Sequence, residues 1–242
     1  MAVLSVVAAS GAAACGSPGS ARPSDGTPAA TPTASASRGL ETLPAEEIVE
    51  RARVAGHTLT TTTVTVDMPE HPQGALTGTF AQDGNGSCAA TYTLAGKGSA
   101  ELTRSGGTVW LKPDASYLKV FAPDAPASAA GKWVVSDTSK SRGFSTFCDM
   151  GLHLAQNIGR NTDGSLGKDL AVSGARQVDG HQAVVVSMID EDGHPVSYVI
   201  AAEGRPYVLA MEYTAPNPMT VRLGDFNKPL TVTPPPDDQV TR

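Results

Sequence analysis

Apolar and polar side chains alternate along most of this chain from residue 61 onward. Residues 63–68 read Thr-Val-Thr-Val-Asp-Met, and residues 76–80 and 91–94 again place threonine between apolar side chains. Because successive side chains of a β-strand point to opposite faces of a sheet, this period of two predicts antiparallel strands that are buried on one face and solvated on the other. Further short strands are expected at Ala100–Thr103, Thr108–Lys112 and Tyr117–Val120.

The C-terminal part of the chain predicts a meander of hairpins. Asp179-Gly180, Asp192-Gly193 and Glu203-Gly204 lie between apolar runs, and Asp-Gly is a strong signal for a two-residue hairpin turn. These turns bring the expected total to about 10–11 strands. The strands expected in this part are Leu170–Val178, Gln182–Ile189, Val196–Ala201, Tyr207–Tyr213 and Met219–Asp225.

Two segments have helical spacing instead. Pro44 followed by two glutamates suits the start of a helix over residues 45–54, and Gly56 suits its end. Apolar residues recur at helical spacing from Phe144 to Ile158, which predicts a second helix. The predicted fold class is α+β: a large curved antiparallel sheet, a half-barrel of about 10–11 strands, with two or three helices on its concave face.

Cys15 predicts the compartment of the protein. It follows an apolar run, and Ala-Ala-Ala-Cys at residues 12–15 has the form of a lipobox, where a bacterial signal peptide is cut before a cysteine that becomes diacylated, for instance with palmitate. We therefore expect a signal peptide at residues 1–14 and lipidation of Cys15. The run lacks the usual basic start, which a start codon assigned downstream of the true one would explain. The alternatives are an ordinary secretory signal with an incidental Cys15, or a frayed apolar N-terminus.

The composition changes immediately after this cysteine. Residues 15–38 are rich in Ser, Pro, Thr and Ala, and such a segment buries too little apolar surface to offset its ordering entropy, so it is expected to be a disordered tether. The folded domain is expected at residues 39–234, followed by a tail at residues 235–242. No other run is long and apolar enough to span a bilayer, so membrane contact is expected through the lipid on Cys15.

The other two cysteines, Cys88 and Cys148, are predicted to form a disulfide. Lipidation of Cys15 leaves one pair, and a pair outside the cytoplasm is expected to oxidise. Cys148 lies on the apolar stripe of the second predicted helix, and Cys88 has the same strand parity as Tyr92, so both side chains face inward. The bridge would fix this helix to the inner face of the sheet. Two unrelated buried thiols are the alternative.

Charge and motifs exclude several classes of function. The net charge is −6 and Lys and Arg are not clustered, so nucleic-acid binding is not expected. The sequence has no G-x-S-x-G elbow, phosphate-binding loop or H-E-x-x-H motif. Residues 161–165 resemble part of a calcium loop but lack its closing glutamate, and residues 190–192 are interpreted as a charged turn. We predict no enzymatic activity, no cofactor and no metal site.

Inward-facing aromatic and apolar side chains are the candidates for ligand binding. We expect a strongly curved sheet of ten or more strands to enclose volume that two or three short helices do not fill. The alternative is that these side chains simply fill the core. The residues predicted to line a cavity are Tyr92, Leu94, Val109, Leu111, Phe144, Phe147 and Leu152.

The order of these features resembles a known superfamily. The lipobox, the tether, the first helix, the threonine-rich strands and a helix around Phe147-Cys148-Asp149 are followed by Glu-Gly-Arg-Pro-Tyr-Val-Leu at residues 203–209 and Asp-Phe-Asn-Lys-Pro-Leu at residues 225–230. In this order the chain resembles actinobacterial lipoproteins of the LolA-like superfamily, among them the mycobacterial LppX/LprG lipid-carrier lipoproteins.

This resemblance implies a half-barrel sheet covered by helices, with an apolar cavity that holds acyl chains. It implies a lipid-anchored protein on the extracytoplasmic face of the cell membrane that binds or carries an acylated lipid or amphiphile. The implied partners are the membrane, through the lipid on Cys15, and the acylated ligand. The alternative is a non-enzymatic envelope sensor or regulatory lipoprotein that binds another envelope protein.

Overall fold

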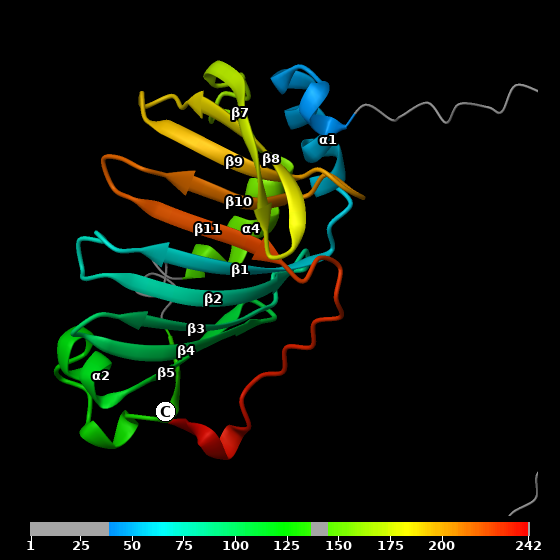
Figure 1. Ribbon diagram of the computed structural model, residues 1–242. Coiled ribbons are helices and arrows are strands. Elements are labelled where there is room, and N and C mark those ends of the chain that lie inside the picture. The colour runs from blue at the N-terminus through cyan, green and yellow to red at the C-terminus, as the bar shows by residue number, and fades with distance from the viewer. Residues whose placement is uncertain (1–38, 137–144, 242) are drawn as a thin grey trace, which may run out of the picture. The chain divides into compact units, whose positions relative to one another are not determined.

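A computed structural model describes residues 39–136 and 145–241 of the chain (Figure 1). Cys15, predicted to carry the lipid, and Phe144, predicted to line a cavity, lie outside the described residues. The signal peptide, the lipidation and the tether therefore stay predictions.

The described strands form a single open sheet in the order β12-β6-β5-β4-β3-β2-β1-β11-β10-β9-β8-β7. Every neighbouring pair is antiparallel except β12 and β6, which are parallel. The expected large antiparallel sheet is confirmed, and it is open rather than a closed barrel. The strands are β1 (Thr61–Met68), β2 (Leu76–Asp83), β3 (Cys88–Leu94), β4 (Gly98–Ser105), β5 (Thr108–Pro113), β6 (Trp133–Val135), β7 (Lys168–Val178), β8 (His181–Ile189), β9 (Pro195–Ala201), β10 (Val208–Tyr213), β11 (Met219–Gly224) and β12 (Val240–Thr241).

The prediction of a strand at residues 117–120 is wrong. This segment belongs to helix α2 (Ala115–Phe121). Asp114 caps the helix, because its carboxylate accepts a hydrogen bond from the backbone N–H of Tyr117 at 2.7 Å and so satisfies a donor that no helical carbonyl can reach. The described residues form twelve strands, because two very short strands, β6 and β12, were not predicted. β12 lies within residues 235–242, which were expected to follow the domain as a tail.

Two helices cover one face of the sheet, which we call the inner face (Figure 1). They are α1 (Ala45–Gly56) and α4 (Phe147–Gln156). The inward side chains of the central strands are almost fully buried, among them Val64, Val66 and Phe80, while threonines between them face outward as predicted. The remaining helical turns are the short η1 (Leu40–Thr42), η2 (Ala127–Ala129) and η3 (Asp237–Gln239).

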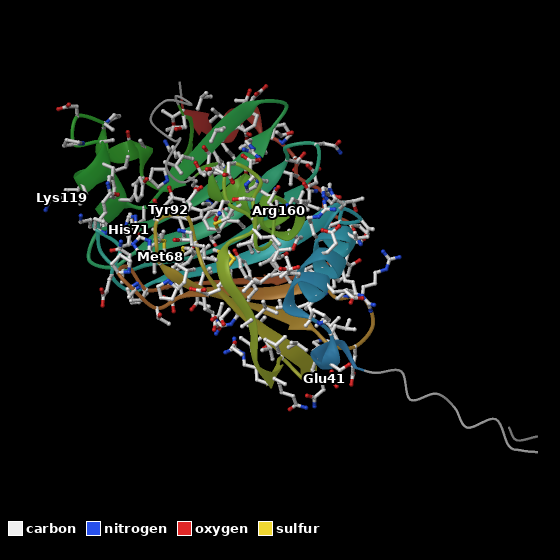
Figure 2. The ribbon with its side chains drawn as sticks, turned by 90° about the horizontal axis from the view of Figure 1, so that it is seen from above. Glu41, Met68, His71, Tyr92, Lys119 and Arg160 are labelled. Carbon is white, nitrogen blue, oxygen red and sulfur yellow. A yellow bond between two sulfur atoms is a disulfide. The ribbon has the colours of Figure 1, made fainter. Side chains whose placement is uncertain are left out.

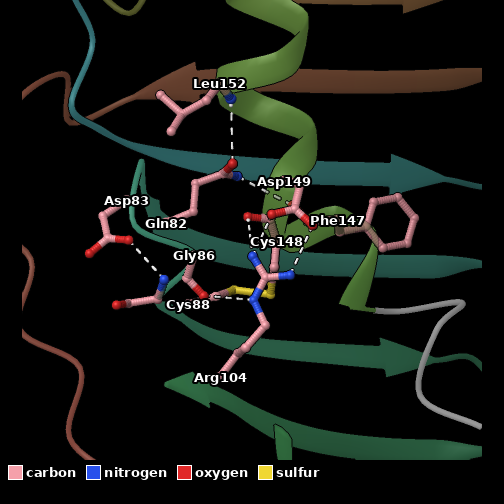
Figure 3. The surroundings of a disulfide bond; sticks show 10 residues. Gln82, Asp83, Gly86, Cys88, Arg104, Phe147, Cys148, Asp149 and Leu152 are labelled. Carbon is pink, nitrogen blue, oxygen red and sulfur yellow. Dashed lines mark hydrogen bonds and ion pairs between the residues drawn. A yellow bond between two sulfur atoms is a disulfide. The ribbon is translucent and has the colours of Figure 1, made fainter. Parts of the chain in front are cut away.

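The first turn of α4 is attached to the sheet by a disulfide between Cys88 on β3 and Cys148 (Figure 3). This is the pairing that strand parity and the helical stripe predicted. Beside it, the Arg104 guanidinium on β4 donates at 2.8 Å to the Asp149 carboxylate and at 2.8 Å to the carbonyl of Gly86. The helix is thus fixed covalently and by charge-assisted hydrogen bonds at the same end.

A buried glutamine makes a second attachment. Gln82 on β2 is fully buried; its amide nitrogen donates to the carbonyl of Phe147 at 3.3 Å and its oxygen accepts from the backbone N–H of Leu152 at 3.4 Å (Figure 3). A buried amide is costly unless both its donor and acceptor are used. These two hydrogen bonds therefore favour one position of α4 on the sheet.

Close packing of α4 on β1 depends on a glycine in the middle of the helix. A Cβ atom at Gly151 would lie 2.3 Å from a methyl carbon of Val64 and 2.9 Å from one of Thr62. Glycine weakens a helix by about 1 kcal/mol relative to alanine. Here the missing side chain is what lets helix and sheet approach.

We predict that replacing both Cys88 and Cys148 with alanine lowers the free energy of unfolding by about 4 kcal/mol, because the bridge closes a loop with a sequence separation of 60 residues. Urea unfolding followed by circular dichroism measures this change. The unaltered protein under reducing conditions serves as the matched control and should behave like the double variant. A double variant as stable as the oxidised protein would contradict this account of α4.

We predict that Gly151→Ala lowers the free energy of unfolding by about 1–3 kcal/mol, because the added methyl group overpacks the contact with Val64. His153→Ala, on the exposed side of the same helix, should change stability by no more than about 0.5 kcal/mol. Thermal and urea unfolding of both variants test this. A Gly151→Ala variant that is stabilised would show that helix propensity dominates and that the helix is not closely packed.

Candidate functional site

A cavity of about 880 Å³ lies next to the attached end of α4. Its walls are the inner face of strands β3 to β6, helix α2, the start of α4 and the turn between β1 and β2. The described residues that line it are Met68, His71, Pro72, Gln73, Tyr92, Leu102, Leu111, Pro113, Tyr117, Leu118, Phe121, Ala122, Val134, Val135, Ser136 and Phe147.

Three of the predicted lining residues lie in this wall, namely Tyr92, Leu111 and Phe147. Three others, Leu94, Val109 and Leu152, are buried in the core and are not among the residues that line the cavity. Strand parity correctly places Leu94 and Val109 on the inner face. Strand parity does not predict whether another side chain packs against Leu94 and Val109 on that face.

Much of the wall comes from elements that the sequence did not assign to the site. Helix α2 contributes Tyr117, Leu118 and Phe121, and the turn between β1 and β2 contributes residues 71–73. The available signal was Asp114, whose side chain caps α2. Had Asp114 been interpreted as a helix cap, the apolar residues that follow would have predicted a helix with one buried side.

A row of aromatic rings runs along the inner wall. The ring of Phe80 lies 5.1 Å from that of Phe147 and 6.3 Å from that of Tyr92, measured between centroids. Tyr92 in turn makes an edge contact with Tyr117 at 5.9 Å, and Tyr117 lies 4.5 Å from Phe121. These separations are those of attractive aromatic pairs. The rings join β2, β3, α2 and α4 into one apolar surface.

The described polar side chains of the wall are few and lie in three places: the turn at residues 71–73, Ser136 after β6, and the pair Tyr92 and Tyr117. Figure 2 shows His71 and Met68 near Tyr92, and the neighbouring turn residues Pro72 and Gln73 are exposed, so this turn forms the mouth of the cavity. Deeper in the wall, the Tyr92 hydroxyl donates a hydrogen bond to the Tyr117 hydroxyl at 3.1 Å. Burial is the main cause that raises the pKa of both tyrosines above 10.0.

The described residues that line the cavity include no aspartate, glutamate, lysine or arginine. An acid–base mechanism would need a group of converging titratable side chains, and the described part of this wall does not supply one. The wall can bind apolar chains by contact, and it can donate hydrogen bonds from neutral hydroxyl groups.

The charged turn between β8 and β9 brings possible metal ligands together. One ligand atom each of Asp190, Asp192 and His194 lies within 4.8 Å of the others. The Asp190 carboxylate, however, accepts hydrogen bonds from the backbone N–H groups of Asp192 at 3.0 Å and His194 at 2.8 Å. These hydrogen bonds explain why the three side chains lie close together: they belong to a structured hairpin turn.

No protein-family model matches the chain, and no curated protein is significantly similar to it in sequence. Among solved structures, it is similar to LprF from Mycobacterium bovis, with 14% sequence identity and a TM-score of 0.52 over 79% of this chain and 96% of that one. It is similar also to the lipoprotein LppX of Mycobacterium tuberculosis, with 13% identity and a TM-score of 0.52 over 78% of this chain and 98% of the other. The expected likeness to mycobacterial lipoproteins such as LppX is confirmed at the level of the fold.

Among the described helices, none is both long and apolar enough to cross a membrane.

We predict that the free energy of unfolding falls as the pH rises above about 10. In the unfolded chain tyrosine loses its proton near that pH, whereas burial keeps Tyr92 and Tyr117 protonated in the folded protein because it raises their pKa. Stability is then fully present below the unfolded pKa and is lost between the unfolded and the folded pKa. Urea unfolding at a series of pH values, with tyrosinate absorbance recorded in parallel, measures this effect.

Tyr198 contributes in the same direction, since burial raises its pKa to about 12. The matched control is the double variant Tyr92→Phe/Tyr117→Phe, whose loss of stability per pH unit should be smaller by up to about 1.4 kcal/mol for each hydroxyl removed. Ionisation of all five tyrosines near pH 10 in the folded protein, without loss of stability, would contradict the burial of the pair.

Proposed function

We propose that this protein is a lipid-anchored, extracytoplasmic lipoprotein that binds or carries an acylated lipid or amphiphile without enzymatic chemistry. The observation that carries the proposal is the cavity of about 880 Å³ on the inner face, whose wall is mostly aliphatic and aromatic. A site of this volume lies within the range of about 300–1,000 Å³ that is usual for small-molecule ligands.

The physics of such a wall favours long acyl chains. Each methylene group moved from water into an apolar environment contributes about 0.8 kcal/mol, whereas association costs at least about 4 kcal/mol in lost translational and rotational freedom. Around five buried methylene groups are therefore needed before binding becomes favourable at all. Ligands with one or more long chains fit this requirement, and small apolar molecules do not.

Several features support a location outside the cytoplasm. Residues 12–15 have the form of a lipobox, and the two cysteines of the folded domain form a disulfide, a bond that persists in oxidising compartments. The structural neighbour LppX is itself named a lipoprotein. In this proposal the lipid on Cys15 anchors the protein, and the tether up to residue 38 lets the domain reach away from the membrane surface.

The open edge of the sheet at β7 is the observation that favours the alternative function, an envelope sensor or regulatory lipoprotein that binds another protein. In the described part of the chain β7 pairs only with β8, and most of its side chains are exposed. Such an edge can add a strand from a partner. Two register shifts interrupt its pairing with β8, and irregularities of this kind protect an edge from further pairing. Carriage of a lipid is therefore the function that we propose.

The direct test is mass spectrometry of an organic extract of the full chain, purified from a cell that exports it. The expected result is a stoichiometric lipid with at least one long acyl chain that stays with the protein through gel filtration. Protein that contains no lipid, and that binds no added fluorescent fatty-acyl probe, would contradict the proposal. A reproducible protein partner in place of lipid would favour the regulatory alternative.

We predict that Ala122→Trp lowers the amount of bound lipid at least about tenfold, because the indole occupies volume beside Phe121 and Leu118 in the wall of the cavity. Val120→Trp is the matched control: it adds the same side chain to α2 at a position where the native residue is 44% exposed and is not part of the wall. Extraction and mass spectrometry of both variants measure the effect. Equal lipid content in the two variants would show that the lipid binds elsewhere.

A further inference from the structure

The two tyrosine hydroxyls in the cavity wall form a pair that is largely shielded from water. Tyr92 on β3 is 3% exposed and Tyr117 on α2 is 7% exposed, and both line the cavity. Their hydroxyl oxygens lie 3.1 Å apart, with Tyr92 as the donor. Among the described residues that line the cavity, these two are the tyrosines.

Counting hydrogens shows what this pair can offer to a ligand. Two phenols carry two O–H hydrogens, and the bond between them uses one. The Tyr117 oxygen accepts from Tyr92, and among the described residues no group accepts the Tyr117 hydrogen. Burial raises the pKa of both groups, so both hydroxyls keep their hydrogens at neutral pH. A buried donor without an acceptor is costly, by about 1–3 kcal/mol.

The rest of the wall limits the charge of the group that Tyr117 can meet. Among the residues that line the cavity, the titratable ones are the two tyrosines and His71, and His71 belongs to the turn at the mouth. A carboxylate or phosphate drawn down to the tyrosines would lose its hydration, and the described residues of the wall offer it no lysine or arginine. An uncharged carbonyl oxygen pays a much smaller desolvation cost and accepts one hydrogen bond.

We infer that the hydroxyl of Tyr117 donates a hydrogen bond to an uncharged carbonyl oxygen of the bound lipid, so that the cavity selects acyl esters over free fatty acids and over hydrocarbons. This inference rests on the proposed function, because it names the chemical class that the same cavity binds. In this arrangement the ester lies beside the Tyr92–Tyr117 pair. Its acyl chain lies along Leu102, Leu111, Phe121 and Phe147, which form the neighbouring apolar wall.

The test uses the full chain, stripped of endogenous lipid, and three probes of equal chain length: methyl palmitate, palmitic acid and hexadecane. Each probe displaces a bound fluorescent acyl probe at about pH 8, where a free carboxylic acid is ionised. Methyl palmitate should bind about three- to tenfold more tightly than hexadecane, because this ratio corresponds to the net free energy of one neutral hydrogen bond. Palmitic acid should bind less tightly than the ester.

The double variant Tyr92→Phe/Tyr117→Phe removes both hydroxyls, because Tyr117→Phe alone would keep one donor hydroxyl in the pair. It should abolish the preference for the ester over hexadecane and leave the affinity for hexadecane within about twofold. Tyr207→Phe, which removes a hydroxyl outside this wall, should keep the preference. Thermal unfolding of both variants reports whether they are folded. If the double variant does not fold, the ranking of the three probes on the unaltered protein still decides.

The outcomes separate this inference from the proposed function. An ester preference that the double variant Tyr92→Phe/Tyr117→Phe removes supports the inference. Equal affinity for ester and hydrocarbon, or tightest binding of the free acid, overturns the inference while the cavity still binds lipid. Failure of the acyl probe and of all three ligands to bind overturns the proposed function as well.

Discussion

The structure depends first on the attachment of α4 to the inner face of the sheet. The disulfide joins the first turn of this helix to β3, the Arg104 guanidinium contacts Asp149 and the backbone around the bridge, and the buried amide of Gln82 bonds to the backbone of α4 at two points. Gly151 then lets the helix lie directly on β1. Because covalent, ionic and neutral contacts coincide at one end of the helix, its position is strongly constrained there.

This constraint divides the inner face into two halves with different properties. Under α1 and α4 the side chains of the central strands pack closely, and Ile48, Phe80 and Val64 are fully buried. Beyond the attached end of α4, strands β3 to β6 are covered by α2 and the turn at residues 71–73, and a cavity remains between them. The packed half supplies the stability of the fold. The hollow half is available for a ligand, since filling it is not needed to hold the sheet together.

The sequence predicted the first half better than the second, for a physical reason. Alternation of threonine with apolar side chains determines which face a strand buries, so the sheet, the helix at residues 45–54 and the Cys88–Cys148 pairing could be predicted. The apolar residues Tyr117 to Val120 suit a strand as well as a helix, and the cap at Asp114 decides for the helix. Which inward side chains meet a cavity depends on what lies opposite them, as the contrast between Leu111 and Leu94 shows. The side chains that lie opposite are set by tertiary packing, and the local sequence does not indicate them.

The central claim, that acyl chains lie in the hollow half of the inner face, is tested most directly by photo-crosslinking. A lipid that carries a photoreactive diazirine in the middle of its acyl chain is bound to the full chain and irradiated, and the modified residues are identified by peptide mass spectrometry. The account predicts modification of Leu111, Phe121, Val134 and their neighbours in the cavity wall. Modification confined to the threonine-rich outer face, or to the edge strand β7, would contradict it.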